Sequence, residues 1–476
     1  MKKLIFSLLS ISFLFFASCK DKDEDEEVIK KPIVTTESDT VKVNKFIVDA
    51  FSDIYLWVDN ININAYKNTY KTYKDPYDFF EKLRYKDDLW SGLTDDIDAL
   101  GESFSGVETS YGYGLALYYA DATHRTVIGF VQFVFSGSPA EKAGLKRGDI
   151  LVDLNGSAIT GQNYTDLYYA PTISISRGYF DGKQFVSYGE SIFMTAVKQY
   201  NNPILKDTII VKGADKIGYL CYSNFLDQSE PDLVKVFSNF KQQNVTDVVL
   251  DLRYNPGGYV RTSIVLSSIL APASAVKSKD IYQIQIWNPA YTQYFLSQGD
   301  DMKEHFTDTL AINMDLSRLY VLVSNGSASA SEATIIALKP YMNVTLIGTK
   351  TSGKFVGGGL LSPDIFYDEN YYKSIKNWGM YLMWFRYTNK DQTYFTEGLD
   401  PDIEVEENNS NLYPFGDEHD PLLGRAIAQI TGQPYVEPQA ARLTPNLKTN
   451  PELTLKRPLD GKLIDNKRIP ILLKKE

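Results

Sequence analysis

The spacing of apolar residues changes along this sequence, and each change predicts a different kind of structure. Between residues 43 and 104 apolar side chains recur at three and four positions, as in FIVDAFSDIYLWV and DPYDFFEKLRY, which is the period of an amphipathic helix. From about residue 112 the period becomes two, as in YGYGLALYY and TVIGFVQFVF, which is typical of strands. We therefore expect a helical N-terminal domain over residues 43–104 and a β domain over residues 105–204.

Strand-like and helix-like segments alternate in the third region, residues 205–432. DVVLDLRYN, LYVLVS and VTLIGT read as buried strands, whereas PDLVKVFSNFKQQ and TSIVLSSILAP have the helical period. This alternation predicts an α/β domain with a largely parallel sheet, within a multidomain α/β protein. Residues 433–476 carry prolines and lysines with little periodicity, so we expect a polar C-terminal tail that packs loosely or is disordered.

The first 19 residues, MKKLIFSLLSISFLFFASC, have the organisation of an export signal. Lysines follow Met1, residues 4–16 are apolar, and small residues precede Cys19; the apolar part is too short to span a membrane. Residues 20–42 are charged and poor in apolar side chains, which predicts a solvated acidic linker. The other cysteine, Cys221, lies in an apolar run, so we expect no disulfide framework.

Charge and motif content narrow the classes of partner and cofactor. The chain has 49 basic and 60 acidic residues, a net charge of −11, and this charge would repel a phosphate backbone, so we expect no nucleic-acid partner. GTKTSGKF, residues 348–355, has the spacing of a P-loop. However, Phe355 stands where a serine or threonine would bind magnesium, and FVGGGLLSPD cannot open the required helix. We expect no cofactor and no metal site.

The stretch NGSASASEATIIALKP, residues 325–340, allows a structural and a chemical interpretation. Ser329 and Glu332 have the spacing of a capping box at the start of a helix. Alternatively, Ser329 is a nucleophile, which requires a base. The three histidines lie in polar stretches with no associated serine motif, which disfavours a Ser/His/Asp triad. Lys354, in the glycine-rich stretch GKFVGGG, becomes a candidate base if burial lowers its pKa.

The stretch SPAEKAGLKRGDILVDLNG, residues 138–156, predicts a short helix, a strand and a turn at Asn-Gly. With the strands before it, this block resembles a PDZ domain in its circularly permuted bacterial form. The resemblance implies that Tyr113, Gly114, Leu115 and Ala116 form the loop that holds the terminal carboxylate of an extended peptide. The alternative is a small β domain with glycine turns.

Four motifs occur in order behind the PDZ-like block: DLRYNPGG, NGSASASE, GTKTSGK and GLDPDIEV. Together they resemble the C-terminal processing peptidase (tail-specific protease) family, serine endopeptidases with a Ser-Lys dyad. The resemblance implies that Ser329 is the nucleophile and Lys354 the base. It also implies an oxyanion hole from the backbone amides of Ala330 and of Gly257 or Gly258.

The sequence departs from the family in the residues after Lys354. Many members place a glutamine shortly after the dyad lysine to orient it, but FVGGGLL contains no polar side chain. The acidic residue that some members have in the helix after the nucleophile is also absent, since Lys339 and Pro340 occupy that area.

The resemblances imply an exported serine endopeptidase, with residues 205–432 as the catalytic domain. Its partners would be protein or peptide substrates with C-terminal or unfolded segments, recognised through the PDZ domain. FASC resembles a bacterial lipobox, which implies that Cys19 is lipidated and anchors a lipoprotein in the cell envelope, at the outer membrane and facing the periplasm or the surface. The alternative is a PDZ-containing peptide-binding lipoprotein with a weak or inactive dyad.

Overall fold

The structure, a computed structural model, describes residues 37–120, 123–437, 447, 453, 462–465 and 469–472 of the 476-residue chain. The predicted signal peptide, with Cys19, lies outside the described residues, as does most of the predicted linker. The chain divides into a short unit, Met1–Ser38, and a compact unit, Asp39–Glu476, and the elements below belong to the second. None of the described helices is long and apolar enough to cross a membrane.

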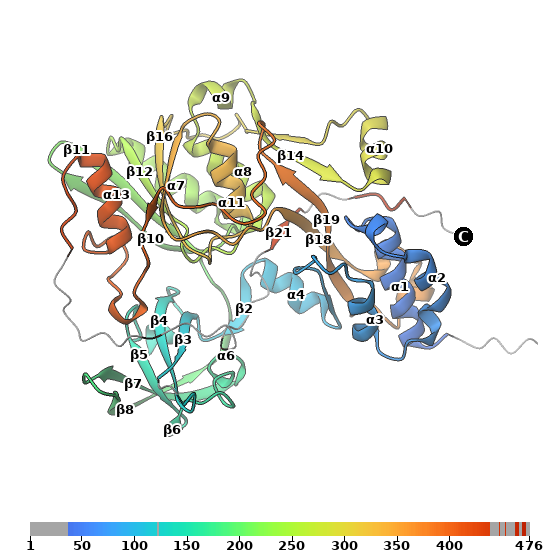
Figure 1. Ribbon diagram of the computed structural model, residues 1–476, viewed down its shortest axis with the longest axis horizontal. Helices are drawn as coiled ribbons and strands as arrows, with labels where there is room; N and C mark the ends of the chain where they lie inside the picture. Colours follow the sequence, from blue (N-terminus) through green and yellow to red (C-terminus); the bar gives the residue numbers. More distant parts are fainter. Residues whose placement is uncertain are drawn as a thin grey trace, which may run out of the picture. The chain divides into compact units, whose positions relative to one another are not determined.

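The helices of the N-terminal region, blue in Figure 1, place their apolar faces in the largest hydrophobic core of the described residues. Phe46 and Phe51 join this core, which also contains Trp287 and Leu382 from the second sheet described below. The N-terminal region therefore shares a core with that sheet. Its elements are α1 (Asp39–Asp53), η1 (Val58–Asn60), α2 (Ile63–Thr69), η2 (Tyr70–Thr72), α3 (Pro76–Leu83), β1 (Gly92–Thr94) and α4 (Ile97–Phe104).

The PDZ-like region is a sheet in the order β3-β4-β5-β7-β8, with β6 paired to β5. Asn155 and Gly156 both have positive φ, 52° and 77°, which is the geometry of a two-residue turn between β5 and β6. β3 is an edge strand of this sheet. The elements are β3 (Tyr113–Tyr119), β4 (Val127–Val134), α5 (Pro139–Lys142), β5 (Ile150–Leu154), β6 (Ser157–Ala158), α6 (Asp166–Tyr169), β7 (Thr172–Phe180) and β8 (Phe185–Thr195), flanked by the paired strands β2 (Val107–Ser110) and β9 (Val197–Tyr200).

A six-stranded sheet in the order β10-β11-β12-β16-β17-β20 forms the centre of the third region. Its pairings are parallel except for the first, which confirms the predicted α/β fold. Val248 and Leu250 of β12 face the core with α7, α8 and α11, while Val249 faces α13. The elements are β10 (Ile204–Lys212), β11 (Asp215–Tyr222), η3 (Asp227–Ser229), α7 (Glu230–Gln242), β12 (Asp247–Asp251), α8 (Val260–Leu270), β16 (Arg318–Val323), α11 (Ala330–Leu338), β17 (Asn343–Gly348), β20 (Ile403–Glu404), η5 (Asn409–Asn411) and α13 (Pro421–Thr431).

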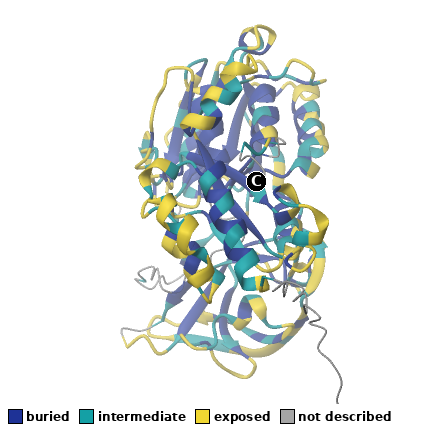
Figure 2. Cartoon of the chain, turned by 90° about the vertical axis from the view of Figure 1, so that its right-hand side faces the viewer, coloured by how far each residue is buried: buried dark blue, intermediate teal, exposed yellow. Residues whose placement is uncertain are grey.

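A second sheet runs in the order β13-β21-β18-β19-β14-β15, with β1 added to β19. The three glycines of β18 lie tightly on β19, because a Cβ on Gly358 would come within 1.9 Å of the Leu382 carbonyl oxygen. Figure 2 shows that buried residues gather along the strands, with exposed residues on outer helices and loops. The elements are β13 (Gly258–Tyr259), α9 (Ala273–Lys277), β14 (Ile281–Trp287), α10 (Pro289–Ser297), β15 (Lys303–His305), β18 (Val356–Leu361), η4 (Pro363–Ile365), α12 (Glu369–Tyr372), β19 (Gly379–Thr388) and β21 (Leu463–Ile464).

The described part of the C-terminal tail differs from the prediction. Leu463 and Ile464 form β21, pair with β13 and β18, and are 0% and 3% exposed. The expectation of a loosely packed tail is therefore wrong for this segment. Two adjacent apolar residues, Leu463 and Ile464, are too few to show a period in the sequence. They nevertheless form a short strand between β13 and β18.

Candidate active site

The candidate residues lie on loops that follow neighbouring strands of the six-stranded sheet. β12, β16 and β17 are adjacent and parallel, so their carboxyl ends share one edge. DLRYNPGG continues from β12, Ser329 follows β16, and Lys354 follows β17. The order of the strands therefore gathers three motifs that are far apart in the sequence.

Ser329 lies on a sharp turn between β16 and α11. Its φ of 61° and ψ of −112° are unusual for a residue with a side chain, and such strain of about 1–3 kcal/mol is stored mainly at functional sites. A nucleophilic serine on a strained strand-to-helix turn has this form. The side chain is buried, and its oxygen has no hydrogen-bond partner of ordinary geometry among the described residues. Ala330 begins α11, where a backbone amide has no partner within the helix.

Glu332 joins the backbone of Ser329 to that of Lys354. Its Oε2 accepts hydrogen bonds from the amides of Ser329 at 2.8 Å and Lys354 at 2.9 Å. Its Oε1 accepts from the Thr351 hydroxyl and the Gly353 amide, both at 2.6 Å. Burial raises the pKa of Glu332 to about 7, against the hydrogen bonds, which lower it. The Glu332 half of the predicted capping box, the bond from the Ser329 amide to the carboxylate, is present, and Glu332 also fixes the loop that carries the candidate base.

Tyr387 provides a second connection between the two residues. Its hydroxyl group lies 3.0 Å from the carbonyl oxygen of Ser329 and 2.8 Å from that of Lys354. Tyr387 is on β19 and fully buried. The Glu332 carboxylate thus binds the backbone amides of Ser329 and Lys354, and the Tyr387 hydroxyl contacts the backbone carbonyls of the same two residues.

The serines on either side of Ser329 anchor the turn to the DLRYNPGG loop. Ser327 donates to the carbonyl oxygen of Leu252 at 2.8 Å, and Ser331 donates to that of Asn255 at 2.8 Å. These hydroxyls are committed to the backbone, whereas that of Ser329 is not. Among the three alternating serines, Ser329 is therefore the one whose oxygen is available for chemistry.

Lys354 lies in a fully buried pocket. Burial lowers its pKa well below the ordinary value, and the nearby charge of Lys462 lowers it further, while Asp88 and Glu332 act in the opposite direction. The Nζ atom lies 5.7 Å and 5.5 Å from the ring centres of Trp90 and Tyr381. A lysine whose pKa is lowered in this way can be neutral near pH 7 and accept a proton.

The two glycines predicted for the oxyanion hole are in different situations. Both have φ values, 120° and 140°, that favour glycine. The amide of Gly257 donates to Oδ1 of Asn255 at 3.0 Å, whereas the amide of Gly258 donates to the carbonyl oxygen of Lys462 at 2.7 Å. Of the two amides, the Gly258 amide therefore binds a carbonyl group from a distant part of the chain, the C-terminal segment with Lys462.

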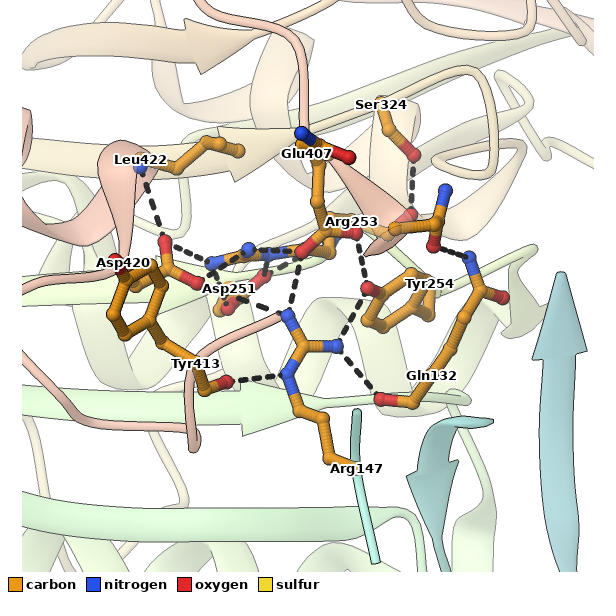
Figure 3. A network of polar contacts seen from close by, with 12 residues as sticks. Gln132, Arg147, Asp251, Arg253, Tyr254, Ser324, Glu407, Tyr413, Asp420 and Leu422 are labelled. Atoms are coloured by element: carbon orange, nitrogen blue, oxygen red, sulfur yellow. Dashed lines mark hydrogen bonds and ion pairs between the residues drawn. The ribbon is translucent and has the colours of Figure 1, made fainter. Parts of the chain in front are cut away.

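Figure 3 shows a buried polar network that joins the PDZ-like region to the DLRYNPGG loop. Arg147, in the loop after α5, donates to Glu407 at 2.6 Å and to the Tyr254 hydroxyl at 2.7 Å. Arg253 donates to the same Glu407 oxygen at 2.6 Å and to Asp420 at 2.9 Å. Burial alone would raise the pKa of Glu407, but the two guanidinium groups lower it to about 2. The loop before Gly257 is thus tied to the PDZ-like region by ion pairs.

The predicted peptide-binding residues lie in a strand, not in a free loop. Tyr113, Gly114, Leu115 and Ala116 belong to β3 and pair with β4, with a bulge between Gly114 and Leu115. The Tyr113 hydroxyl donates to the carbonyl oxygen of Leu167 on α6. The assignment of these residues to a loop is wrong, because strand pairing with β4 extends over all four of them.

Several residues near Lys354 have no distinguishing signal in the sequence. Glu332 was recognised only as a helix cap, and Tyr387, Asp88 and Trp90 carried no signal. Where the family often has a glutamine, the chain has the close-packed glycines of β18. Instead, the Nζ atom of Lys354 lies near the aromatic rings of Trp90 and Tyr381.

A buried serine on a strained turn, linked through the Glu332 carboxylate to the backbone of a lysine of lowered pKa, is an arrangement that suits a serine hydrolase. The sequence comparisons give the family. Residues 216–405 match the model of peptidase family S41, residues 42–92 match the S41 N-terminal domain, and residues 134–170 match a PDZ domain. The chain belongs to peptidase family S41.

Two named bacterial proteins are similar over part of their length. The chain is 26% identical over 308 residues to a CtpA-like serine protease of Staphylococcus aureus strain N315, covering 63% of this chain and 58% of that protein. It is 26% identical over 333 residues to the carboxy-terminal processing protease CtpA of Bacillus subtilis strain 168, covering 68% of this chain and 62% of that protein. The similarity thus spans less than two thirds of either relative.

Two solved structures share the fold. One is a protein of Bacteroides fragilis NCTC 9343 assigned to the S41 proteases, with a TM-score of 0.66 and 25% identity over 81% of this chain and 97% of that one. The other is a photosystem II D1 C-terminal processing protease, with a TM-score of 0.51 and 19% identity over 84% of this chain and 99% of that one. At that identity the second similarity concerns the fold alone.

Proposed function

We propose that this protein is a serine endopeptidase in which Ser329 is the nucleophile and Lys354 the general base. The observation that carries the proposal is the strained, buried Ser329 whose backbone shares the Glu332 carboxylate with that of Lys354. Membership of peptidase family S41 and the CtpA names of the relatives support the same activity.

In the proposed reaction, neutral Lys354 accepts the hydroxyl proton as Ser329 attacks the carbonyl carbon of a peptide bond. The amides of Ala330 and Gly258 stabilise the developing oxyanion. The Lys354 ammonium then gives its proton to the leaving amine, and an ester remains on Ser329. A water molecule, deprotonated by Lys354, hydrolyses this ester and regenerates the hydroxyl group.

We infer that the substrates are exported proteins, bound through C-terminal or unfolded segments by the PDZ domain. The position of β3 at the end of its sheet supports this role, because an extended peptide can pair with an edge strand. We also propose that the protein is a lipoprotein of the bacterial envelope, anchored through Cys19 after removal of residues 1–18. The leader sequence supports this location.

The activity can be tested with protein that lacks residues 1–19 and an unfolded protein as substrate. The wild-type protein should cleave it, and Ser329→Ala should reduce the rate at least a hundredfold. A matched control is Ser297→Ala, at an exposed serine of α10, which should keep the wild-type rate. Equal rates for the wild type and Ser329→Ala, or no cleavage by either, would favour the peptide-binding alternative.

A further inference from the structure

A segment of the chain's own C-terminal region lies between the two parts of the site. β21 pairs in parallel with β13, which begins at Gly258, and with β18, which follows Lys354. In Figure 1 β21 lies beside β18, although the two are far apart in sequence. A strand in this position separates the predicted oxyanion donor from the strand that follows the predicted base.

The contacts of this segment are made largely by its main chain. The Lys462 carbonyl oxygen accepts from the Gly258 amide at 2.7 Å, and the Leu463 carbonyl oxygen accepts from the Tyr381 hydroxyl at 2.7 Å. The Asp465 amide donates to the Gly358 carbonyl oxygen at 2.9 Å. Main-chain bonds of this kind are how a protein binds an extended peptide as an added strand.

The side chains of the segment occupy separate environments. Leu463 enters the largest core, whereas Ile464 packs with Val356, Tyr381 and Met383 in another cluster. The Lys462 ammonium donates to the Trp90 carbonyl oxygen at 2.8 Å and lies 4.3 Å from the Tyr381 ring centre. Successive side chains of the segment thus point into different environments, as expected for a bound strand.

The carbonyl group of Lys462 also lies close to the nucleophile. A Cβ placed on Gly257 would be 2.7 Å from the Lys462 carbonyl oxygen and 2.7 Å from Cβ of Ser329. Both groups are therefore next to the same glycine. The carbonyl oxygen that the Gly258 amide binds thus lies on the same side of Gly257 as Ser329.

We propose that residues 462–465 occupy the position of the substrate strand, and that the site cleaves the chain's own peptide bond between Lys462 and Leu463. This inference rests on the proposed peptidase function. The Ser329 oxygen forms a bond to the carbonyl carbon of Lys462, and the bond from that carbon to the Leu463 nitrogen breaks. Lys354 carries the serine proton to the Leu463 nitrogen, and water then releases a new carboxyl terminus at Lys462.

Occupation of the site has a second consequence for other substrates. A foreign peptide can pair with β13 and β18 only where β21 has left, so the two compete. The uncleaved chain should therefore turn over an added substrate more slowly than a chain whose segment has been displaced or cut and released.

The test compares wild-type protein with Ser329→Ala, both lacking residues 1–19, by intact mass under denaturing conditions. The wild type should separate into a chain ending at Lys462 and a fragment beginning at Leu463, and Ser329→Ala should remain whole. The same samples are assayed with an unfolded protein. An intact Lys462–Leu463 bond in wild type that digests the unfolded protein would overturn this inference alone. Absence of both cleavages would overturn the proposed function as well.

A second variant tests the docking of the strand. Ile464→Asp places a carboxylate in an apolar cluster, so self-cleavage should slow at least tenfold. Turnover of the unfolded protein, compared between chains that are still uncleaved, should at least double. Val436→Asp is the control, since Val436 is 78% exposed and should change neither rate. Opposite changes would support occupation of the site by β21, whereas unchanged rates or an equal fall of both in Ile464→Asp would contradict it.

Discussion

The backbone amides of Ser329 and Lys354 donate to the same carboxylate oxygen, Oε2 of Glu332, at 2.8 and 2.9 Å. The Tyr387 hydroxyl lies between the carbonyl oxygens of the same two residues. The separation of the proposed nucleophile and base therefore depends on two buried side chains that need not touch substrate. Both act by positioning.

Glu332→Gln should lower the turnover number about a hundredfold, which is the cost expected for small misplacement of reacting groups. A glutamine offers a single acceptor oxygen, so its amide group would face backbone N–H donors that the carboxylate now binds. The measurement is turnover of an unfolded protein, with folding checked by circular dichroism.

The control for Glu332→Gln is Thr334→Val, on the same helix. The Thr334 hydroxyl is buried near the Tyr282 hydroxyl and is not among the groups that bind the Glu332 carboxylate, so its loss should leave turnover nearly unchanged. Comparable activity of Glu332→Gln and Thr334→Val would show that the shared carboxylate does not position the site.

The pH dependence should follow the charges around Lys354. Only the neutral amine accepts a proton, so kcat/KM should rise with pH through a pKa that burial holds well below the ordinary value. Asp88→Asn removes a negative charge that raises this pKa, so the rise should move to lower pH. Lys462→Met removes a positive charge that lowers the pKa, so the rise should move to higher pH.

These opposite shifts can be measured from the pH profile of the proposed self-cleavage, during which Lys462 is in place, for the two variants and the wild type. Lys216→Met, a change of the same kind at a distant, partly exposed lysine, should leave the profile in place. Shifts in the same direction for Asp88→Asn and Lys462→Met would exclude Lys354 as the titrating group.

Lys354→Arg should be as inactive as Lys354→Ala, although it keeps the positive charge. An arginine stays protonated at any working pH and cannot accept the serine proton. Because the nucleophile and base act as one unit, the double variant with Ser329→Ala should be little slower than either single variant. The measurement is the turnover of an unfolded protein. Substantial activity in Lys354→Arg would exclude Lys354 as the general base, and a histidine would become the candidate base.

Ser329 and Lys354 could be proposed from the sequence because their motifs are local. A strand, an Asn-Gly turn and a helix surround the serine, and glycines surround the lysine. The largely parallel sheet could likewise be predicted, since buried strands and amphipathic helices alternate over residues 205–432.

The residues that hold the dyad could not be predicted, because tertiary structure brings them to it. Tyr387 reads as one more aromatic residue of a strand, and Asp88 as part of an N-terminal helical region. Lys462 lies in a stretch without periodicity, where two apolar residues give no pattern. In each case the contact depends on a strand pairing or a shared core between residues that are far apart in the sequence.

Cys19→Ser should move the protein from the membrane fraction to the soluble fraction. Lipidation of the cysteine would supply the membrane affinity, and serine cannot carry the thioether-linked lipid. The measurement is fractionation of cells followed by a high-salt wash, with the Ser18→Ala variant as control. Retention of Cys19→Ser on membranes would contradict the lipobox assignment.

Gly114→Val should weaken the capture of peptides with a free C-terminus and disturb the contact between the PDZ-like region and the site. A Cβ on Gly114 would lie 2.3 Å from the ring of Phe133, so the ring has to move. Phe133 packs against Tyr254, with ring centres 5.6 Å apart, and Tyr254 belongs to the Arg147 and Glu407 network. The displacement is therefore transmitted toward the DLRYNPGG loop.

The measurement for Gly114→Val is the affinity for a peptide with a free carboxyl terminus and for its amidated form, together with cleavage of an unfolded protein. The wild type should prefer the free carboxylate, and the variant should lose about tenfold in affinity, or about 1.4 kcal/mol. Gly92→Val is the control, because a Cβ there meets no atom within 4 Å and the φ of Gly92, like that of Gly114, lies outside the region that favours glycine. If Gly114→Val binds both peptides as the wild type does, the edge of β3 is not the site of peptide capture.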